Sequence, residues 1–323
     1  MRQIPFLRTS GWMVLAALPL LLSGCDLALF NPKGQIGAQQ KDLIILAFGV
    51  MQVVVIPVVF MTLFFAWRYR RSNIEKNKAT YLPNWSHSNK IEAAVWAAPF
   101  IIILFLGVIT WQTTHSLDPH KPLDSVDKAP LEVDVISLDW KWLFVYPEQG
   151  IATINELYAP KDTPINFRVT SGSVMNSFYI PRLGTQIYAM SGMSNTLHLI
   201  GNEVGVYDGR SVAYSGKGFA EMTFKTHITS DADFQAWVEK VKNSQGAALT
   251  FPEGYNTVAK PSIANEVEYF PSVDQGFYNK VLGIFQEGHM AAMAQNEHEP
   301  TAGHTMSGAH HSDSTQQHAE AVE

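Results

Sequence analysis

The sequence predicts a membrane-anchored all-β protein, in which a hairpin of two transmembrane helices is followed by a β-sandwich outside the membrane. Of its 323 residues 46% are hydrophobic, and these are strongly segregated towards the first 113 positions. Two apolar runs in that region are each long enough to span a bilayer, which takes ~20 residues. Beyond them, short runs of alternating apolar and polar residues recur with turn residues between them, a pattern typical of an antiparallel sandwich.

Residues 1–24 are expected to form a lipoprotein signal peptide. Arg2 and Arg8 give the segment a positive start, and an apolar run then extends to the sequence LSGC, which ends at Cys25. This sequence resembles the bacterial lipobox, in which the cysteine becomes the lipidated first residue of the mature chain. The aspartate that follows it resembles a signal for retention in the inner membrane. An uncleaved helix with a buried free thiol at Cys25, the only cysteine, is the alternative.

The two apolar runs are predicted to cross the membrane as helices at residues 43–67 and 91–113. Pro57 lies near the middle of the first run and is expected to kink that helix. The connecting loop, 68–90, is strongly basic and is therefore expected to face the cytoplasm. Its charged residues are Arg68, Arg70, Arg71, Lys76, Lys78 and Lys90, against the single acid Glu75. The N-terminal segment 25–42 and everything after residue 113 are then expected in the periplasm.

Glu92 is the only ionisable residue within either predicted span, at the cytoplasmic end of the second. A carboxylate is costly in lipid, so its presence indicates either a proton or ion pathway or a polar partner. The alternative is an interfacial acid that reaches headgroup water, and the sequence leaves both interpretations open.

Residues 114–250 are expected to form the β-sandwich, after a proline-containing linker that leaves the membrane. The strands are expected at 131–137, 140–146, 151–154, 165–170, 178–180, 196–200 and 219–224. A helix is predicted from Ser230 to Asn243, because Ser230 is a suitable N-cap and Phe234, Trp237, Val238 and Val241 share one face. Large aromatics usually serve burial, so Trp140 and Trp142 are expected to pack in the core or an interface.

The C-terminal region divides into an arm and a tail. Residues 251–286 contain proline, glycine and aromatics without a clear period, and a short helix is expected between Val273 and Phe285. Residues 287–323 are expected to be a disordered, solvated tail, because they contain few large apolar side chains. The tail is rich in histidine, at His289, His298, His304, His310, His311 and His318, so weak metal binding is the alternative.

Several functions are disfavoured by what the sequence lacks. The net charge is −6 and no Lys/Arg run occurs beyond the membrane flanks, which argues against nucleic-acid binding. No Walker loop, G-x-S-x-G, C-x-x-C or H-E-x-x-H motif is present, so a nucleotide enzyme or an independent hydrolase has little support. Neither predicted span contains a histidine that could bind haem, so any haem is expected in another subunit.

Two stretches resemble the copper-binding loops of subunit II of the haem-copper respiratory oxidases. They are YDGRSVAYSGKGFAEM, residues 207–222, and MNSFYIPRLGTQIY, residues 175–188. The family pattern C-x-E-x-C-x3-H-x2-M places its ligands on Ser211, Ala213, Ser215, Phe219 and Met222, and the upstream histidine on Asn176. Only Met222 retains a possible ligand atom. A lone thioether does not hold copper, so the resemblance is to the branch without this site, the quinol oxidases of the cytochrome bo type.

This resemblance implies a Greek-key cupredoxin fold and a role in a proton-pumping quinol oxidase of the bacterial inner membrane. The expected partners are oxidase subunit I, the other oxidase subunits, membrane lipid and quinol. Subunit I would hold the haems and copper, and this chain would hold no cofactor. The resemblance places a proton-channel mouth at Glu92 and a packing role on the C-terminal arm. An electron-transfer module with mononuclear copper and a lipoprotein scaffold outside any oxidase are the alternatives. Whether the quinol is ubiquinol or menaquinol is left open.

Overall fold

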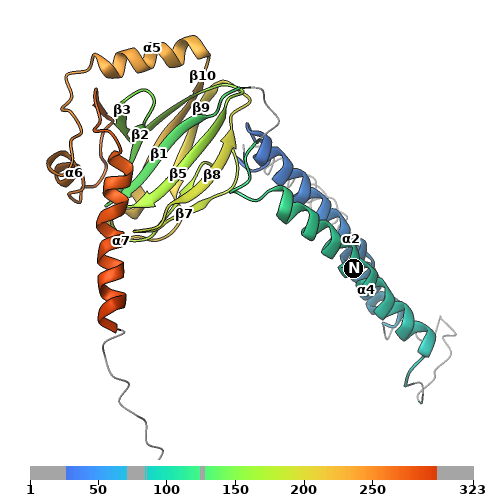
Figure 1. The fold of residues 1–323 in the computed structure, drawn as a ribbon. Helices are drawn as coiled ribbons and strands as arrows, with labels where there is room; N and C mark the ends of the chain where they lie inside the picture. The colour runs from blue at the N-terminus through green and yellow to red at the C-terminus, as the bar shows by residue number, and fades with distance from the viewer. Residues whose placement is uncertain (1–26, 71–83, 85, 124–127, 297–323) are drawn as a thin grey trace, which may run out of the picture.

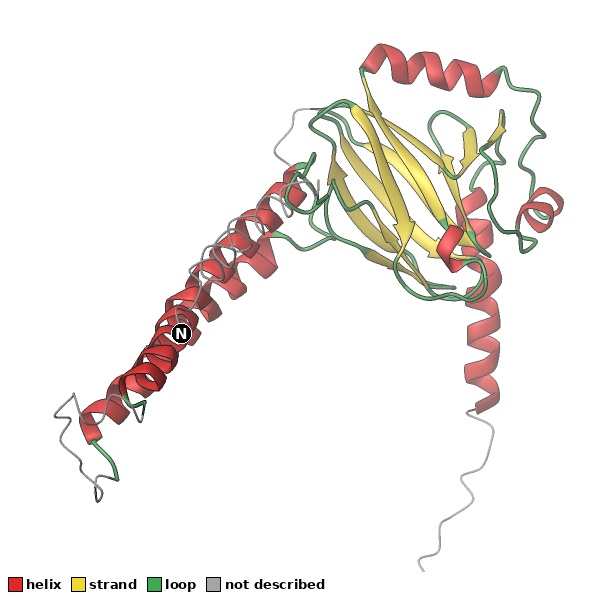
Figure 2. Cartoon of the chain, turned by 180° about the vertical axis from the view of Figure 1, so that it is seen from behind, coloured by secondary structure: helices red, strands yellow, loops and turns green. Residues whose placement is uncertain are grey.

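The computed structural model describes residues 27–70, 84, 86–123 and 128–296. The signal peptide and Cys25 lie outside these residues. Two long helices form a hairpin that meets a β-sandwich at one end, and the views from opposite sides agree on this arrangement (Figures 1 and 2). The hairpin and the following β-rich domain confirm the predicted fold class.

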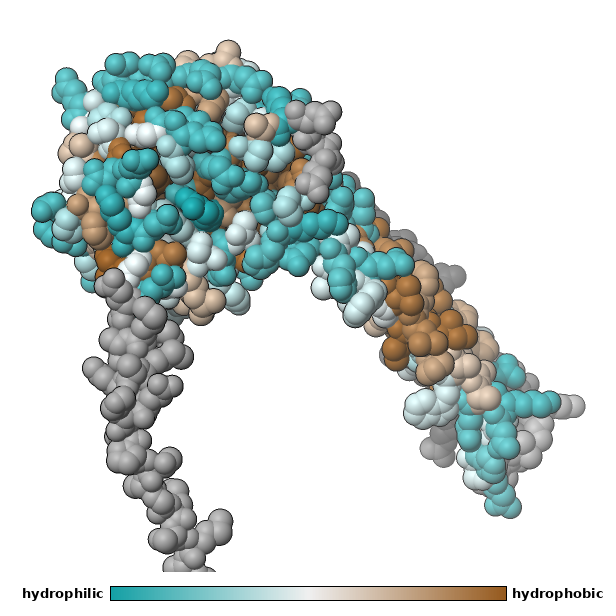
Figure 3. Space-filling model, viewed as in Figure 1, coloured by the Kyte–Doolittle hydropathy of each residue, from teal (hydrophilic) through white to brown (hydrophobic). Residues whose placement is uncertain are grey.

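The hairpin consists of α2 (Gln35–Arg68) and α4 (Asn89–Ser116), with 34 and 28 residues. Both helices are long and apolar enough to cross a membrane by length and composition. Each extends beyond the predicted span at both ends, because the flanking polar residues continue the helix outside the apolar run. Figure 3 shows the middle of the hairpin as a hydrophobic band between hydrophilic ends.

The β-domain contains two packed sheets. The first has the strand order β11-β3-β2-β1-β5-β8 and the second β4-β10-β9-β6-β7. Their bounds are β1 (Leu131–Leu138), β2 (Lys141–Tyr146), β3 (Ile151–Ile154), β4 (Glu156–Pro160), β5 (Pro164–Ser171), β6 (Asn176–Tyr179), β7 (Ile187–Ala189), β8 (Asn195–Ile200), β9 (Gly205–Ser211), β10 (Thr223–Thr229) and β11 (Glu268–Phe270).

The sandwich is mixed, which corrects the prediction that it is antiparallel throughout. Strand β1 pairs in parallel with β5, and β10 pairs in parallel with β4. The reason is the Greek-key path: the chain leaves the first sheet after β3, forms β4 in the second and returns as β5 beside β1. The predicted strand at 219–224 is also wrong in its first half, because Phe219–Glu221 forms the 3-10 turn η1 and β10 begins at Thr223.

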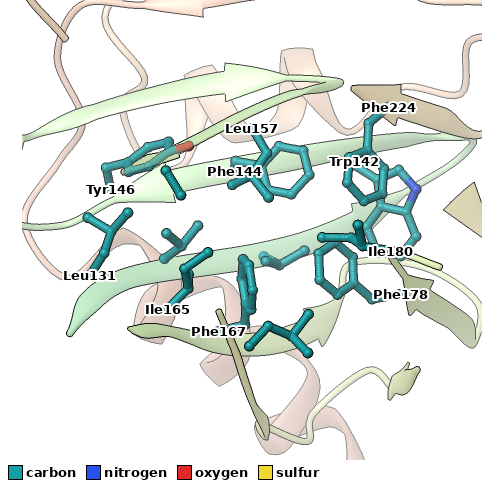
Figure 4. Close-up of a cluster of buried hydrophobic side chains, with 14 of the residues drawn as sticks. Leu131, Trp142, Phe144, Tyr146, Leu157, Ile165, Phe167, Phe178, Ile180 and Phe224 are labelled. Carbon is teal, nitrogen blue, oxygen red and sulfur yellow. The ribbon is translucent and has the colours of Figure 1, made fainter. Parts of the chain in front are cut away.

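An aromatic cluster between the sheets forms the main core (Figure 4). The rings of Phe178 and Phe224 stack with their centroids 5.2 Å apart, and Trp142 meets Phe178 edge-on at 5.3 Å. Trp142 is fully buried, which confirms its predicted place in the core. The ring of Trp140 is partly buried and packs against the same cluster.

The C-terminal region comprises α5 (Asp231–Lys242), α6 (Glu253–Val258), β11 and α7 (Phe277–Asn296). It closes one end of the sandwich with α5, adds β11 to the edge of the first sheet and covers the outer face of that sheet with α6 and α7. Ser230 caps α5 as predicted, since its hydroxyl accepts a hydrogen bond of 3.1 Å from the Asp233 N–H. A second apolar cluster, which includes Leu143, Tyr255 and Phe277, lies between this arm and the sheet.

The last helix corrects the predicted start of the disordered tail. Helix α7 continues to Asn296, so residues 287–296 are helical. The C-terminal part of the tail, with five of its six histidines, lies outside the described residues. In both views α7 and the hairpin lie at opposite edges of the β-domain, and both extend downwards from it (Figures 1 and 2).

Candidate functional site

The loops that resemble a copper site meet at one end of the sandwich. Asn176 begins β6, Ser211 ends β9, and β6 pairs with β9 through Phe178 and Ser211. The Ser211 hydroxyl donates a hydrogen bond of 3.1 Å to the Asn176 side-chain oxygen, and the Ser211 N–H donates to the Met222 carbonyl, also at 3.1 Å. All three residues are buried. The structure therefore brings together three of the six positions aligned with copper ligands.

Asn176 belongs to a buried network of polar side chains. Its amide nitrogen donates to the Ser137 hydroxyl at 3.1 Å and to the Val174 carbonyl at 3.2 Å. The Ser137 hydroxyl in turn donates to the Ser171 hydroxyl at 3.0 Å, and Ser171 donates to the Val174 carbonyl at 2.7 Å. These bonds join β1, β5, β6 and β9. The end of the sandwich is thus cross-linked by side chains whose polar groups satisfy one another, as buried polar groups must.

The other three aligned positions make different contacts. The Ala213 carbonyl accepts a bond of 3.3 Å from the Ser211 hydroxyl, so it stays close to the network through its backbone alone. The Ser215 hydroxyl is buried and has no hydrogen-bond partner among the described residues. The Phe219 ring contacts Tyr214 edge-on, with centroids 5.6 Å apart. The structure does not bring Ser215 or Phe219 into the network.

The side chains present do not fit a copper centre. Copper in cupredoxin-like sites is held by thiolate and imidazole, with thioether as a weak further ligand. Here the aligned positions offer two hydroxyls, an amide, a methyl, a phenyl ring and the single thioether of Met222. Among the described residues, no group of three or more His, Cys, Asp or Glu is placed to hold a metal ion. These polar side chains can hold the loops together by hydrogen bonds.

Trp140 covers the loop that follows Ser211. Its backbone has φ +72°, in the left-handed region that non-glycine residues rarely adopt. The indole N–H donates a bond of 2.9 Å to the Ser215 carbonyl, and a Cβ added at Gly218 would lie 2.6 Å from the indole ring. Glycine at 218 therefore allows the ring to lie flat against the loop, which agrees with the predicted packing role.

Glu92 lies in the first turn of α4, and its N–H donates to the Ser88 carbonyl at 2.9 Å. Its side chain is exposed in this chain. The carboxylate is therefore available to water or to a partner subunit at that end of the hairpin.

A second polar cluster was not predicted from the sequence. The Tyr158 ring lies between the His227 ring, at 4.3 Å, and the Trp237 ring, at 4.4 Å, nearly parallel to both. Glu156 accepts a bond of 2.7 Å from the Tyr269 hydroxyl and lies 3.6 Å from the His227 ring nitrogen. Burial lowers the pKa of His227, against the opposing effect of the nearby Glu156 carboxylate. Because strand β4 was not predicted, Glu156 and Tyr158 were not expected to lie beside β10.

Two family models match the part of the chain that follows the hairpin. The family described as "Cytochrome C oxidase subunit II, periplasmic domain" matches residues 128–228, and the "COX Aromatic Rich Motif" matches residues 242–289. The solved periplasmic domain of subunit II of cytochrome oxidase from Bradyrhizobium japonicum aligns with 36% of this chain and 95% of that chain, at 26% identity and a TM-score of 0.34.

The fold and site define a membrane-anchored, cupredoxin-like oxidase subunit. The chain is 53% identical over 290 residues to the cytochrome bo(3) ubiquinol oxidase subunit 2 of Pseudomonas aeruginosa, covering 89% of this chain and 85% of that one. It is also 53% identical to the ubiquinol oxidase subunit 2 of Acetobacter aceti, over 83% of this chain and 86% of that one. The quinol oxidase subunit 2 of Bacillus subtilis is 38% identical, over 80% of each chain. The chain belongs to the quinol oxidase subunit 2 family.

Proposed function

We propose that this chain is the subunit of a proton-pumping ubiquinol oxidase that carries no redox centre of its own. The observation that carries the proposal is the buried hydrogen-bond network at Asn176 and Ser211, where copper ligands would be needed. Electrons would pass from ubiquinol to the haems and copper of subunit I without crossing this domain. Ubiquinol is favoured because the relatives at 53% identity are named ubiquinol oxidase subunits.

The role of the chain in the complex would be to hold subunit I and to cover it on the periplasmic side. A short joint between hairpin and sandwich supports this role. The Gly37 N–H donates to the Leu183 carbonyl at 3.0 Å, and the Asn202 N–H donates to the Lys33 carbonyl at 2.8 Å. A Cβ added at Gly34 would lie 2.4 Å from the Ile200 carbonyl oxygen, so the chain passes the domain in direct contact. Such a joint would hold the β-domain in a fixed position relative to the helices.

The membrane topology and anchor follow the same proposal. Residues 1–24 would be removed as a signal peptide, Cys25 would carry lipid and the loop 68–90 would face the cytoplasm. Two spans far exceed one acyl chain as an anchor. Cys25→Ser should therefore lose labelling by a radioactive fatty acid yet stay in the membrane fraction. Recovery of the variant in the soluble fraction would contradict the two spans.

Glu92 would admit protons from the cytoplasm towards subunit I. Its position in the first turn of α4, next to the basic loop, supports this assignment, since that end of the hairpin is expected at the cytoplasmic surface. The carboxylate would exchange protons with cytoplasmic water and pass them to the partner subunit.

The experiment that tests the absence of a redox centre measures metal in this chain alone. The full-length chain is dissociated from its partners in detergent, and its copper is determined by mass spectrometry together with its visible spectrum. We expect copper far below one atom per chain and no visible band. Stoichiometric, tightly bound copper or a charge-transfer band would overturn the proposal in favour of an electron-transfer module.

A further inference from the structure

A cavity of about 250 Å³ lies where the outer ends of α2 and α4 meet the β-domain beside β8. One wall is formed by the first two turns of α2, with Gln35 and Gln39. The others are the segment that follows α4, with Asp118 and Lys121, and the side chain of His198 on β8. A water molecule occupies ~30 Å³ of the liquid, so the cavity has room for a polar group of several heavy atoms.

The cavity lies at the depth of the lipid headgroups. On α2 the apolar run begins at Leu43, so Gln39 lies ~6 Å beyond it at 1.5 Å per residue. On α4 the apolar run ends at Trp111, and Ser116 lies ~7.5 Å beyond it. The headgroup layer is roughly 5–8 Å thick on each side of the hydrocarbon core. Both helices thus place the cavity in that layer on the periplasmic side.

The walls of the cavity suit a phosphate. The N-terminus of α2 carries the positive end of the helix dipole, which favours an anion, and Lys121 adds a cation. His198 is 8% exposed and its Nδ1 lies 2.6 Å from the Asn166 side-chain oxygen. Because the Asn166 amide nitrogen donates to Glu132, its oxygen must accept from His198, so Nδ1 carries the proton. The other nitrogen of the neutral ring is then an acceptor, which suits the amine of a headgroup and not its phosphate. Asp118 on another wall suits the amine of a zwitterionic headgroup.

An apolar groove runs along α4 from this cavity towards the membrane centre. It has a volume of about 530 Å³ and is lined by Ile103, Leu106, Gly107, Thr110, Trp111, Thr114 and His115. A Cβ added at Gly107 would meet nothing within 4 Å, so the groove has an open notch there. Residues 103, 107, 110, 114 and 117 share one face of the helix by their spacing, and Leu117 lines the cavity. The groove therefore leads up to the cavity along a single face.

We propose that this chain binds one membrane phospholipid, with the phosphate in the cavity between the N-terminus of α2 and Lys121 and an acyl chain in the groove at Gly107. The arrangement of a polar cavity at headgroup depth above an apolar groove matches the two parts of a phospholipid. Binding there would fill the space between the hairpin and the β-domain and so fix their relative orientation.

Photocrosslinking in membranes tests this site. The full-length chain, in its native membrane complex, is reconstituted with phosphatidylethanolamine that bears a diazirine on one acyl chain. We expect labelling of the α4 peptide that contains residues 103–115. Lys121→Glu should lower this labelling at least about fivefold, since a basic residue near the membrane surface contributes on the order of that factor. Gly107→Leu, which fills the notch without touching the fold, should also lower it, whereas Lys242→Glu on the distant α5 should not.

The outcomes separate a lipid from other occupants. Equal labelling of the wild type and of the Lys121→Glu and Gly107→Leu variants would overturn the proposal, as would absence of label from α4, which is the result if a partner subunit covers the groove. Inorganic phosphate at millimolar concentration should not compete with the probe. If it displaced the probe, the cavity would be a site for soluble anions and the lipid assignment would be wrong.

Discussion

The hydroxyl of Ser211 donates a hydrogen bond of 3.1 Å to the side-chain oxygen of Asn176, and so joins β9 to β6 through a contact from which water is excluded. In the family pattern these two positions are metal ligands on separate loops. Here a hydrogen bond links the same loops that a metal ion would link. The network that continues to Ser137 and Ser171 extends the link to the opposite sheet.

Removing Asn176 should therefore destabilise the β-domain. Asn176→Ala deletes three hydrogen bonds in a buried site and leaves the Ser137 and Ser211 hydroxyls with fewer partners, so we expect a loss of about 2–3 kcal/mol in the free energy of unfolding. The measurement is denaturant unfolding of the full-length chain in detergent. Ser215→Ala is the matched control, because the Ser215 hydroxyl has no hydrogen-bond partner in the described part of the chain. Equal effects of the two substitutions would show that the network contributes nothing.

Restoring the family ligands should create a copper site. The combined changes are Asn176→His, Ser211→Cys, Ala213→Glu, Ser215→Cys and Phe219→His. Because positions 176, 211 and 222 already meet, we expect bound copper with an intense visible thiolate band. Residues 212–221 must rearrange, since Ser215 and Phe219 now contact Trp140 and Tyr214. The same variant with Ser215 retained is the control and should bind less copper. A folded variant that takes up none would refute the loop alignment.

Glu92→Gln should slow quinol-driven oxygen consumption, because the amide keeps the shape of the side chain but does not ionise. We expect a decrease on the order of tenfold, smaller than the ~10²–10⁴ of a group that transfers protons in the transition state. Glu92→Asp should retain part of the rate. Glu75→Gln, in the predicted loop that precedes this helix, is the control, and haem content in each preparation monitors assembly. A wild-type rate in a fully assembled Glu92→Gln complex would show that Glu92 does not admit protons and is an interfacial acid.

His227 should make the stability of the β-domain depend on pH. Burial lowers its pKa in the folded chain below the ordinary value of 6.5, so the unfolded chain binds more protons as the pH falls through that region. Stability should therefore decrease as the pH is lowered from 7.5 to 5.5. His227→Phe keeps a ring against Tyr158 and removes the titrating group, so this variant should show a smaller decrease in denaturant unfolding. Identical pH profiles of the wild type and the His227→Phe variant would show that His227 does not cause the pH dependence.

Strand β9 was missed for a physical reason. Strand β9 buries Tyr207, Gly209 and Ser211 on alternate positions, so two of its three inward residues are not hydrophobic and the period-2 signal disappears. Glycine is needed at 209 because the Phe224 ring packs there; an added Cβ would lie 2.1 Å from it. By contrast, the strand Ile151–Ile154, with apolar residues at both ends, was predicted with its bounds.

The site was predictable only in part. The spacing of the two loops indicated correctly that positions 176, 211 and 222 lie together, because the family pattern encodes that proximity. Ser137 and Ser171 gave no such signal. They are ordinary polar residues at the ends of strands, and only the register of β1 with β5, which pairs Ser137 with Ser171, brings them beneath Asn176. The joint at Gly34 and Gly37 could not be predicted either, because the partners of these glycines are backbone carbonyls, which carry no sequence signal.

Purification of the native membrane complex through a tag on this chain tests most directly whether it is a subunit of a quinol oxidase without a redox centre of its own. We expect a haem-containing partner with many membrane spans to copurify, and the complex to consume oxygen with ubiquinol but not with reduced cytochrome c. Recovery of the chain without a haem-containing partner, or oxygen consumption driven by cytochrome c, would contradict this function.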